Sequence, residues 1–216
     1  MNLFTPLAWS DTGFILTGIL NTVYISVVAI IVGSILGLIV GFIRAESNKS
    51  VNAFLGAFLD ILRSVPLIIQ LILFSTFIGA LGYPLDPFVA GSIILSLYTM
   101  AFMSEVFRSG FDSVPVSMVK AARSLGMTYL QTVRHVRIPI GMRAVFPSWI
   151  GVALSVIKDS ALVSVIGYME LLRTAEQLIS RTQQPLMILI GVGLFYFMIS
   201  YPLSRYGKYV ERKMEV

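Results

Sequence analysis

Residues 14–43 read FILTGILNTVYISVVAIIVGSILGLIVGFI, a run without a single charged side chain. Asp11 and Thr12 can cap a helix that includes this run, and the polar residues 44–49 predict its end near Ile43. About 20 apolar residues are enough for a helix to cross a bilayer, so this helix is longer than one crossing requires. We therefore expect its first part to be tilted or to lie at the membrane interface.

The composition of the whole chain also indicates a membrane protein. Of its 216 residues, 56% are hydrophobic and 12% are charged, whereas a soluble domain has about 25% charged residues. This difference excludes an ordinary soluble domain. The net charge of +5 is attributed to lysine and arginine in cytoplasmic loops, and no nucleic-acid partner is expected. The chain has no cysteine, so disulfides and thiolate-bound metals are excluded.

Four further apolar segments predict four more spans, at about residues 51–81, 88–103, 139–157 and 186–203. A polar insert, residues 109–138, separates the third span from the fourth. The mixed segment 161–184 is expected to form helices at or near the membrane interface. The predicted fold class is all-α: a polytopic helical membrane protein with about five transmembrane helices and a two-helix cytoplasmic loop, in one domain over residues 1–216.

The positive charges predict the orientation of the chain in the membrane. Residues 44–50, the polar insert and the C-terminal tail hold most of the lysine and arginine, so they are expected to be cytoplasmic. Residues 1–11 and 82–87 hold none and are expected outside. The N-terminus is therefore predicted to lie outside and the C-terminus in the cytoplasm. Within the first helix, Gly33, Gly37 and Gly41 recur on one face and predict close packing against a second helix.

The polar insert has the sequence pattern of two short helices. Pro115 suits a first helical turn, and an amphipathic helix over residues 117–125 is expected to stop at Gly126. Thr128 can then cap a second helix over residues 129–136, before Pro139 begins the next span. Two short helices joined by a glycine turn form a compact projection.

This projection has two interpretations. Ala121 and Ala122 are expected to keep one flank flat enough for a groove in another protein. Alternatively, Arg123, Arg134 and Arg137 hold the helices against anionic lipid at the membrane surface.

Charged residues within the spans are costly in lipid and are therefore candidates for function. Asp60 and Arg63 lie three residues apart, as do Glu105 and Arg108, so each pair can neutralise itself on one helical face. Both pairs can simply mark the cytoplasmic ends of their spans. In the functional interpretation, Pro66 breaks the second span and exposes backbone groups that line a cavity.

The adjacent charges Lys158 and Asp159, followed by Ser160, end the fourth span. Lys158 can bind a carboxylate and Asp159 an ammonium group, so together they can hold a zwitterion. The same two residues can also pair with other helices and stabilise the fold, and the sequence leaves both interpretations open.

Nothing in the sequence predicts an enzyme. The one histidine, His135, lies between arginines in the polar insert, and no Walker-type glycine-rich loop or metal-binding pattern is present. We therefore expect no catalytic residue and no metal site. Energy for any transport must come from an ion gradient or from another polypeptide.

The polar insert resembles the cytoplasmic loop of the permease subunits of ABC importers for polar amino acids, the family that includes histidine, glutamate, glutamine, arginine and opine permeases. That loop reads Glu-Ala-Ala, three residues, Gly, nine residues, Ile-x-Leu-Pro. At the same spacing this chain has Lys120-Ala121-Ala122, Gly126 and Val136-Arg137-Ile138-Pro139. Lys120 replaces the usual glutamate.

Three other segments are similar to motifs of the same family. Arg63-Ser64-Val65-Pro66 with Gln70 resembles Arg-Gly-Thr-Pro-x-x-x-Gln. Residues 99–105, TMAFMSE, resemble Ser-Ala-Ala-Tyr-x-Ala-Glu, with Phe102 at the tyrosine position. Residues 158–162, KDSAL, resemble Lys-Asp-Thr-Ser-Leu. The resemblance extends from about Thr17 to the C-terminal tail.

The resemblance implies two groups of functional residues. The implied substrate-binding or pathway residues are Arg63, Ser64, Pro66, Gln70, Thr99, Glu105, Lys158, Asp159 and Ser160. The implied ATPase-docking residues are Lys120, Ala121, Ala122, Arg123, Leu125 and Gly126.

The resemblance also implies an ATP-driven importer in the bacterial cytoplasmic (inner) membrane, surrounded by lipid. Its partners are a pair of ABC ATPase subunits, a second permease subunit in a homodimer or heterodimer, and an extracytoplasmic amino-acid-binding protein. ATP and magnesium belong to the ATPase, and no cofactor is expected on this chain. Because Asp159 and Glu105 are acidic, the expected substrate is a polar amino acid, with a weak preference for a cationic one.

Two alternatives belong to other classes of protein. An ion-coupled secondary transporter of a small zwitterionic solute uses the same buried charges, but it needs no docking projection. A membrane scaffold subunit explains the packing glycines, but it does not explain Lys158 and Asp159.

Overall fold

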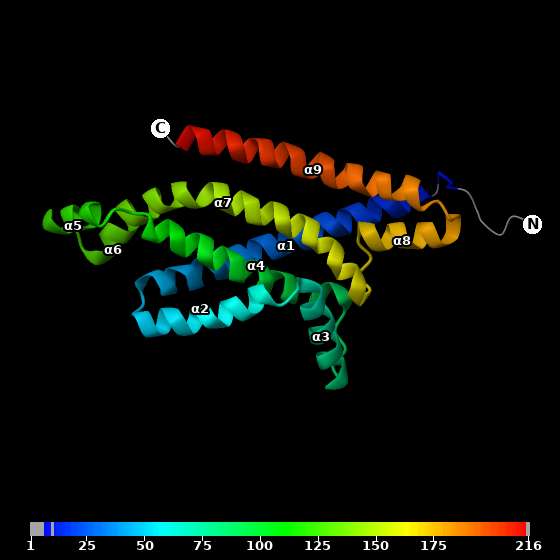
Figure 1. The fold of residues 1–216 in the computed structure, drawn as a ribbon, viewed down its shortest axis with the longest axis horizontal. Helices are drawn as coiled ribbons and strands as arrows, with labels where there is room; N and C mark the ends of the chain where they lie inside the picture. Colours follow the sequence, from blue (N-terminus) through cyan, green and yellow to red (C-terminus); the bar gives the residue numbers. More distant parts are fainter. Residues whose placement is uncertain (1–6, 10, 215–216) are drawn as a thin grey trace, which may run out of the picture. The chain divides into compact units, whose positions relative to one another are not determined.

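The computed structural model describes residues 7–9 and 11–214, and every regular element within them is a helix (Figure 1). In chain order these elements are α1 (Asp11–Glu46), α2 (Lys49–Ser64), α3 (Leu67–Ala80), α4 (Pro87–Asp112), α5 (Val116–Ser124), α6 (Tyr129–Thr132), η1 (Val133–Arg137), α7 (Ile138–Asp159), η2 (Ser160–Ile166), α8 (Leu171–Thr182) and α9 (Pro185–Met214). η1 is a π-helix and η2 is a 3-10 helix. The predicted all-α class is confirmed.

Four helical stretches are long and apolar enough to cross a membrane: α1, α4, the continuous stretch Tyr129–Ile166, and α9 over Pro185–Lys213. The helices α2 and α3 form a fifth candidate, as a pair with a sharp bend at the break between them. The prediction of about five transmembrane helices is confirmed when this bent pair is counted as one span.

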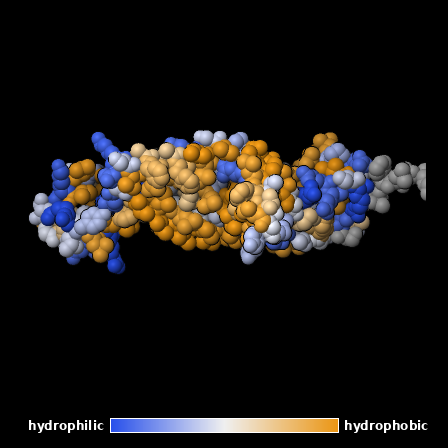
Figure 2. Space-filling view, turned by 90° about the horizontal axis from the view of Figure 1, so that it is seen from below, coloured by the Kyte–Doolittle hydropathy of each residue, from blue (hydrophilic) through white to orange (hydrophobic). Residues whose placement is uncertain are grey.

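Apolar side chains cover much of the molecular face drawn in Figure 2. α9 is the least buried of the four long stretches, since only 6% of its most apolar window is buried within the chain. Leu186, Phe197 and Met198 are among its exposed side chains. Apolar surface of this extent is stable only against lipid or against another protein.

The chain divides into two compact units. Unit 1 comprises residues 1–31, 65–96 and 154–203, and unit 2 comprises residues 32–64, 97–153 and 204–216, each as far as the structure describes them. The helices α1, α4, α7 and α9 contribute residues to both units. The expected single domain over residues 1–216 stays a prediction.

Unit 2 is built on close contact between α1 and α4. A Cβ atom added at Gly37 would lie 2.5 Å from the Cβ of Met103, and one at Gly41 would lie 2.6 Å from the carbonyl oxygen of Ser104. Around this contact, Met103 packs in an apolar cluster with Phe107, Phe111 and Val145. The predicted packing role is therefore confirmed for Gly37 and Gly41.

Unit 1 packs the first part of α1 against α4, η2 and α8. Ile25 and Val163 are fully buried, and both lie within 3.2 Å of a Cβ atom added at Gly91. α8 is strongly amphipathic and buries Leu171, Ala175 and Leu178. The prediction of helices within residues 161–184 is confirmed.

Several helices continue beyond the predicted ends. α4 runs past residue 103 to Asp112, and within this extension Arg108 pairs with both Glu105 and Asp112. The basic tail after residue 203 is also helical, since α9 continues through Pro202 to Met214.

α7 begins at Ile138, next to the predicted start of the fourth span at Pro139, but the expected break between the second helix of the insert and this span is absent. The helix is continuous from Tyr129 through η1 into α7. The N–H of Ile138 bonds to the carbonyl of Val133, five residues back, which shifts the helical bonding pattern immediately before Pro139. A proline has no N–H to donate, so a local π turn at this point accommodates it within a continuous helix.

Candidate functional site

The first half of the polar insert is a short helix with a glycine stop. Pro115 directly precedes α5 as its N-cap, with a non-helical ψ of 129°, so it stands one residue before the first helical turn in which it was expected. At the other end, the N–H of Leu125 bonds to the carbonyl of Ala121 at 3.0 Å, and the N–H of Met127 bonds to the carbonyl of Ala122 at 3.2 Å. Gly126 has a φ of +86°, which a residue with a side chain rarely adopts. The predicted stop at Gly126 is confirmed.

The second half of the polar insert begins with a capping box. The Thr128 hydroxyl accepts a bond from the N–H of Gln131 at 3.3 Å, and the Gln131 side chain accepts one from the N–H of Thr128 at 2.8 Å. This pair satisfies two backbone donors that the start of a helix leaves free. The predicted cap is confirmed, and it fixes the direction in which the chain leaves the glycine turn.

The polar insert exposes several apolar side chains. Leu125 is 86% exposed and Leu130 is 72% exposed, and Lys120, Ala121 and Arg123 are exposed beside them. Ala122 is buried, so only Ala121 of the two alanines contributes to the outer surface. Exposed leucines on a projection that also presents charged side chains indicate a surface that contacts another molecule.

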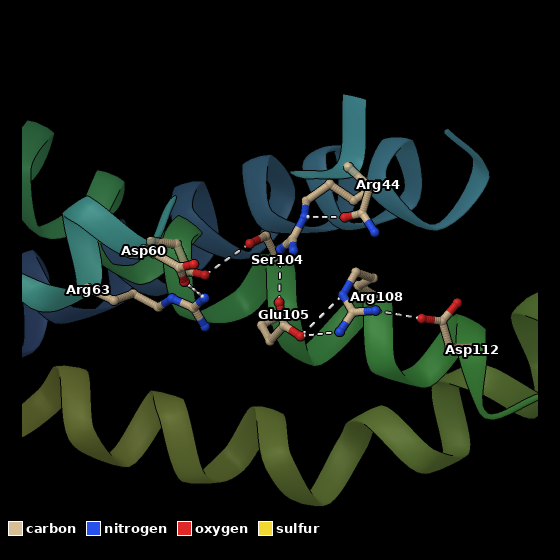
Figure 3. A network of polar contacts seen from close by, with 9 residues as sticks. Arg44, Asp60, Arg63, Ser104, Glu105, Arg108 and Asp112 are labelled. Carbon is tan, nitrogen blue, oxygen red and sulfur yellow. Dashed lines mark hydrogen bonds and ion pairs between the residues drawn. The ribbon is translucent and has the colours of Figure 1, made fainter. Parts of the chain in front are cut away.

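A chain of charged residues lies in unit 2 where α1 ends beside α4 (Figure 3). The Arg44 guanidinium donates to Glu105 Oε2 at 2.9 Å and to Asn52 Oδ1 at 3.1 Å. Glu105 Oε1 accepts from Arg108, which also donates to Asp112 Oδ2 at 2.7 Å. Glu105 therefore accepts hydrogen bonds from two arginines, and both of its carboxylate oxygens are paired with a cation.

Arg44 is held in this network by its surroundings. It is only 7% exposed, and the position that a Cβ atom would take at Gly56 is 3.2 Å from its Nη2. A buried cation is stable only when it is paired and hydrogen-bonded. Glu105 and Asn52 meet that requirement.

A second connection joins the end of α1 to the other half of the polar insert. Glu46 accepts a hydrogen bond from the Tyr129 hydroxyl and forms an ion pair with Arg137. Tyr129 begins α6 and Arg137 ends η1. His135, in the same stretch, is exposed and bonds the carbonyl of Gln131 through its Nδ1, as expected for a surface histidine.

The predicted break in the second apolar segment is present. α2 ends at Ser64, and α3 begins after Pro66, whose ψ of 133° is not helical. The side-chain amide of Gln70 donates to the carbonyl of Val65 at 2.8 Å, which satisfies a backbone group left by the break. Arg63 pairs with Asp60 along α2, in agreement with the predicted i, i+3 pair, and both lie beside Ser104 and Glu105 of α4 (Figure 3).

The segment Lys158-Asp159-Ser160 marks the junction of α7 and η2. Lys158 is exposed, Asp159 is partly buried, and Ser160 is fully buried with its hydroxyl donating to the carbonyl of Ile157 at 2.8 Å. Within residues 7–9 and 11–214, neither Lys158 nor Asp159 forms an ion pair. Lys158 and Asp159 were expected either to hold a zwitterion or to pair with other helices. The described residues show no ion pair between them and another helix of this chain.

The nine predicted pathway residues are divided between the units. Unit 2 holds Arg63, Ser64, Thr99 and Glu105, and unit 1 holds Pro66, Gln70, Lys158, Asp159 and Ser160. Thr99 is fully buried. Their common role in a pathway stays a prediction.

Glu170 is a buried residue that the sequence pattern did not single out. Its two carboxylate oxygens accept the N–H groups of Leu172 and Arg173 at 2.8 and 2.7 Å, so it caps α8. Thr22 of α1 lies beside it and accepts the N–H of Leu171 at 3.0 Å. Burial raises the pKa of the Glu170 carboxyl to about 7, although its backbone hydrogen bonds act in the opposite direction. An acidic residue directly before an amphipathic helix was the available signal.

The chain is similar in sequence to known transport proteins. Residues 29–216 match the family model described as "Binding-protein-dependent transport system inner membrane component". The probable glutamine ABC transporter permease protein GlnM of Bacillus subtilis is 33% identical over 72% of each chain. The arginine transport system permease protein ArtQ of the same organism is 32% identical over 72% of this chain and 71% of its own.

The fold agrees with two solved structures. A crystal structure of an amino acid ABC transporter with histidines has a TM-score of 0.85 and 28% identity, and the match covers 94% of each chain. An inward-facing structure of the MetNI methionine ABC transporter has a TM-score of 0.81 and covers 96% of this chain and 99% of its own. At 19% identity, that second likeness shows the fold alone.

Proposed function

Because this chain belongs to the family of binding-protein-dependent transport system inner membrane components, we propose that it forms the translocation path of an ATP-driven importer. It is a permease subunit of an amino-acid ABC transporter. The observation that carries the proposal is the polar insert, a capped helical projection with exposed leucines on a chain that has no nucleotide-binding motif of its own. In this proposal the energy for transport comes from ATP that partner subunits hydrolyse.

The polar insert docks the ATPase in this proposal. Lys120, Ala121 and Arg123 form the exposed flank of α5, and Leu125 and Gly126 form its end. The small side chain of Ala121 allows the ATPase to approach closely. Leu125, which is exposed to water in the free chain, supplies an apolar contact with the ATPase. ATP and magnesium bind to a pair of ATPase subunits, and this chain carries no catalytic residue.

A second permease subunit completes the membrane part. The rest of the chain covers little of the apolar surface of α9. In this proposal the uncovered part contacts lipid and a second copy or paralogue of the permease. In this proposal the chain lies in the bacterial inner membrane, with the polar insert and the C-terminus in the cytoplasm. An extracytoplasmic binding protein delivers the substrate to the opposite side.

The substrate is a polar amino acid. The relatives are named for different amino acids, glutamine and arginine among them, so the family does not select one. The weak preference for a cationic substrate rested on Glu105 and Asp159. Because Glu105 is already paired with two arginines, this preference now depends on Asp159, whose carboxylate has no ion-pair partner in the described residues.

Uptake into proteoliposomes tests the proposal. The chain is reconstituted with its ATPase and binding protein, and uptake of radiolabelled L-arginine and L-glutamine is measured with ATP inside the vesicles. We expect uptake of at least one of them to require ATP and to be unaffected by ionophores. Uptake that needs an ion gradient and no ATP contradicts the proposal and supports the ion-coupled alternative.

A further inference from the structure

The last turn of α1 is bonded to the helix that leads into the polar insert and to the second half of the insert itself. Arg44 pairs with Glu105 of α4, the helix that enters the insert. Two residues later, Glu46 pairs with Tyr129 and Arg137, in the elements through which the chain leaves the insert. These contacts join residues that are 61, 83 and 91 positions apart in the sequence.

The connection at the entry to the insert is continuous. Glu105 pairs with both Arg44 and Arg108 (Figure 3). Arg108 in turn pairs with Asp112, the last residue of α4 before the loop to α5. A displacement of α4 relative to α1 must therefore separate charged groups.

The connection at the exit depends on a single acceptor. Glu46 receives the Tyr129 hydroxyl on one oxygen and the Arg137 guanidinium on the other. Arg137 is mostly buried, with a side chain that is 15% exposed. Because η1 continues directly into α7, a movement of α6 is transmitted along one unbroken helix.

Separating these contacts is costly because the cations are shielded from water. Arg44 is almost fully buried, and its other hydrogen bond, to Asn52, ties the same guanidinium to α2. A buried charge that loses its partner is not rehydrated, so movement of the connected helices together is favoured over rupture.

We propose that the last turn of α1 acts as a brace, in which Arg44 and Glu46 are positioning residues that make the polar insert move together with α1, α2, α4 and α7. The proposal rests on the proposed function, in which the insert receives the movement of the ATPase. The brace residues are distinct from the exposed docking surface of Ala121 and Leu125. Their loss therefore leaves ATPase binding intact and reduces the transport obtained from each ATP hydrolysed.

The experiment uses the full transporter in proteoliposomes with the variants Glu46→Gln and Glu46→Arg/Arg137→Glu. The double variant restores an ion pair of reversed polarity at the same place. Glu211→Gln, at an exposed glutamate on α9, is the matched control. For each variant the ATPase recovered with the permease, the ATP hydrolysed, and the uptake of L-arginine and L-glutamine are measured.

For Glu46→Gln we expect wild-type recovery of the ATPase and about a fivefold or larger fall in uptake per ATP hydrolysed, the usual range of coupling between two sites. In the double variant, uptake per ATP hydrolysed is expected to return to near the wild-type value. Glu211→Gln is expected to match the wild type. An unchanged ratio in Glu46→Gln overturns the brace, as does a reversed pair that folds and binds ATPase but recovers nothing. If the wild-type permease itself recovers no ATPase, the proposed function fails and not the brace.

Discussion

Gly41 of α1 lies so close to Ser104 of α4 that a Cβ atom on Gly41 would be 2.6 Å from the Ser104 carbonyl oxygen. The same added atom would be 2.9 Å from the Cβ of Phe107. A backbone oxygen cannot rotate away as a flexible side chain can, so the two helices must separate to admit even a methyl group. The distance between α1 and α4 in unit 2 is therefore fixed by the absence of a side chain.

Replacement of Gly41 by alanine is expected to destabilise the protein by about 1–3 kcal/mol, because overpacking forces the backbone of α4 to shift. The thermal unfolding midpoint in detergent measures this effect. Gly151→Ala in α7 is the matched control, since a Cβ atom there meets nothing within 4 Å. The control is expected to be neutral or slightly stabilising, and equal midpoints for the two variants would refute the packing role of Gly41.

Glu170 predicts a pH dependence of stability. The pKa of its carboxyl is about 7 in the folded chain against an ordinary 4.5. Between these two values the folded protein holds a proton that the unfolded chain has released, so its contribution to stability falls as the pH rises from about 4.5 to about 7. Above pH 7 this loss is complete.

The thermal unfolding midpoint, measured from pH 5 to pH 8, tests this contribution with Glu170→Gln as the comparison. The variant loses part of the helix cap at every pH, so only the change in the difference between the two proteins is informative. We expect the wild type to lose stability relative to the variant as the pH rises. Parallel curves would show that Glu170 stays ionised when folded.

Ala121→Trp is expected to abolish co-purification of the ATPase while the permease still inserts in the membrane. The alanine is exposed on α5, and an indole there prevents the close approach that a small residue allows. Arg143→Trp places the same bulk at an exposed position on α7 and serves as the control. Recovery of the ATPase with Ala121→Trp at the wild-type level would exclude this flank of α5 from the docking surface.

Asp159→Asn is expected to reduce uptake by about tenfold or more while the transporter assembles normally, because the variant removes a carboxylate that can attract a cationic group at close range. Its carboxylate has no ion-pair partner in the part of the chain that the structure describes, so little stability should be lost. Uptake of L-arginine and L-glutamine is compared with the yield of purified complex. Unchanged uptake kinetics for both amino acids would argue against a role of Asp159 in the pathway.

Local sequence patterns were sufficient wherever the deciding contacts lie within a few residues. The stop at Gly126, the cap at Thr128 and the break at Pro66 each depend on backbone geometry that one residue type favours, and all three are present. The pairs of Arg63 and Arg108 with acidic residues were also predictable, because their partners are three residues away on the same helix.

The remaining features depend on contacts between distant segments. The pairs of Arg44 with Glu105 and of Glu46 with Arg137 join different helices, and no periodicity within one helix indicates them. The continuous helix through Pro139 was missed because a proline at the start of a polar-to-apolar change usually begins a helix. Here the helix continues instead, because the π turn of η1 changes the hydrogen-bonding pattern just before Pro139, which has no N–H to donate.

The most direct test of the transport mechanism is uptake of a radiolabelled amino acid by proteoliposomes that contain this permease, its ATPase and its binding protein. The vesicles carry ATP inside, and a protonophore is added after uptake has begun. We predict that uptake continues at the same rate with the protonophore and stops when ATP is replaced by a non-hydrolysable analogue. Uptake that collapses with the protonophore while ATP is present would contradict an ATP-driven importer.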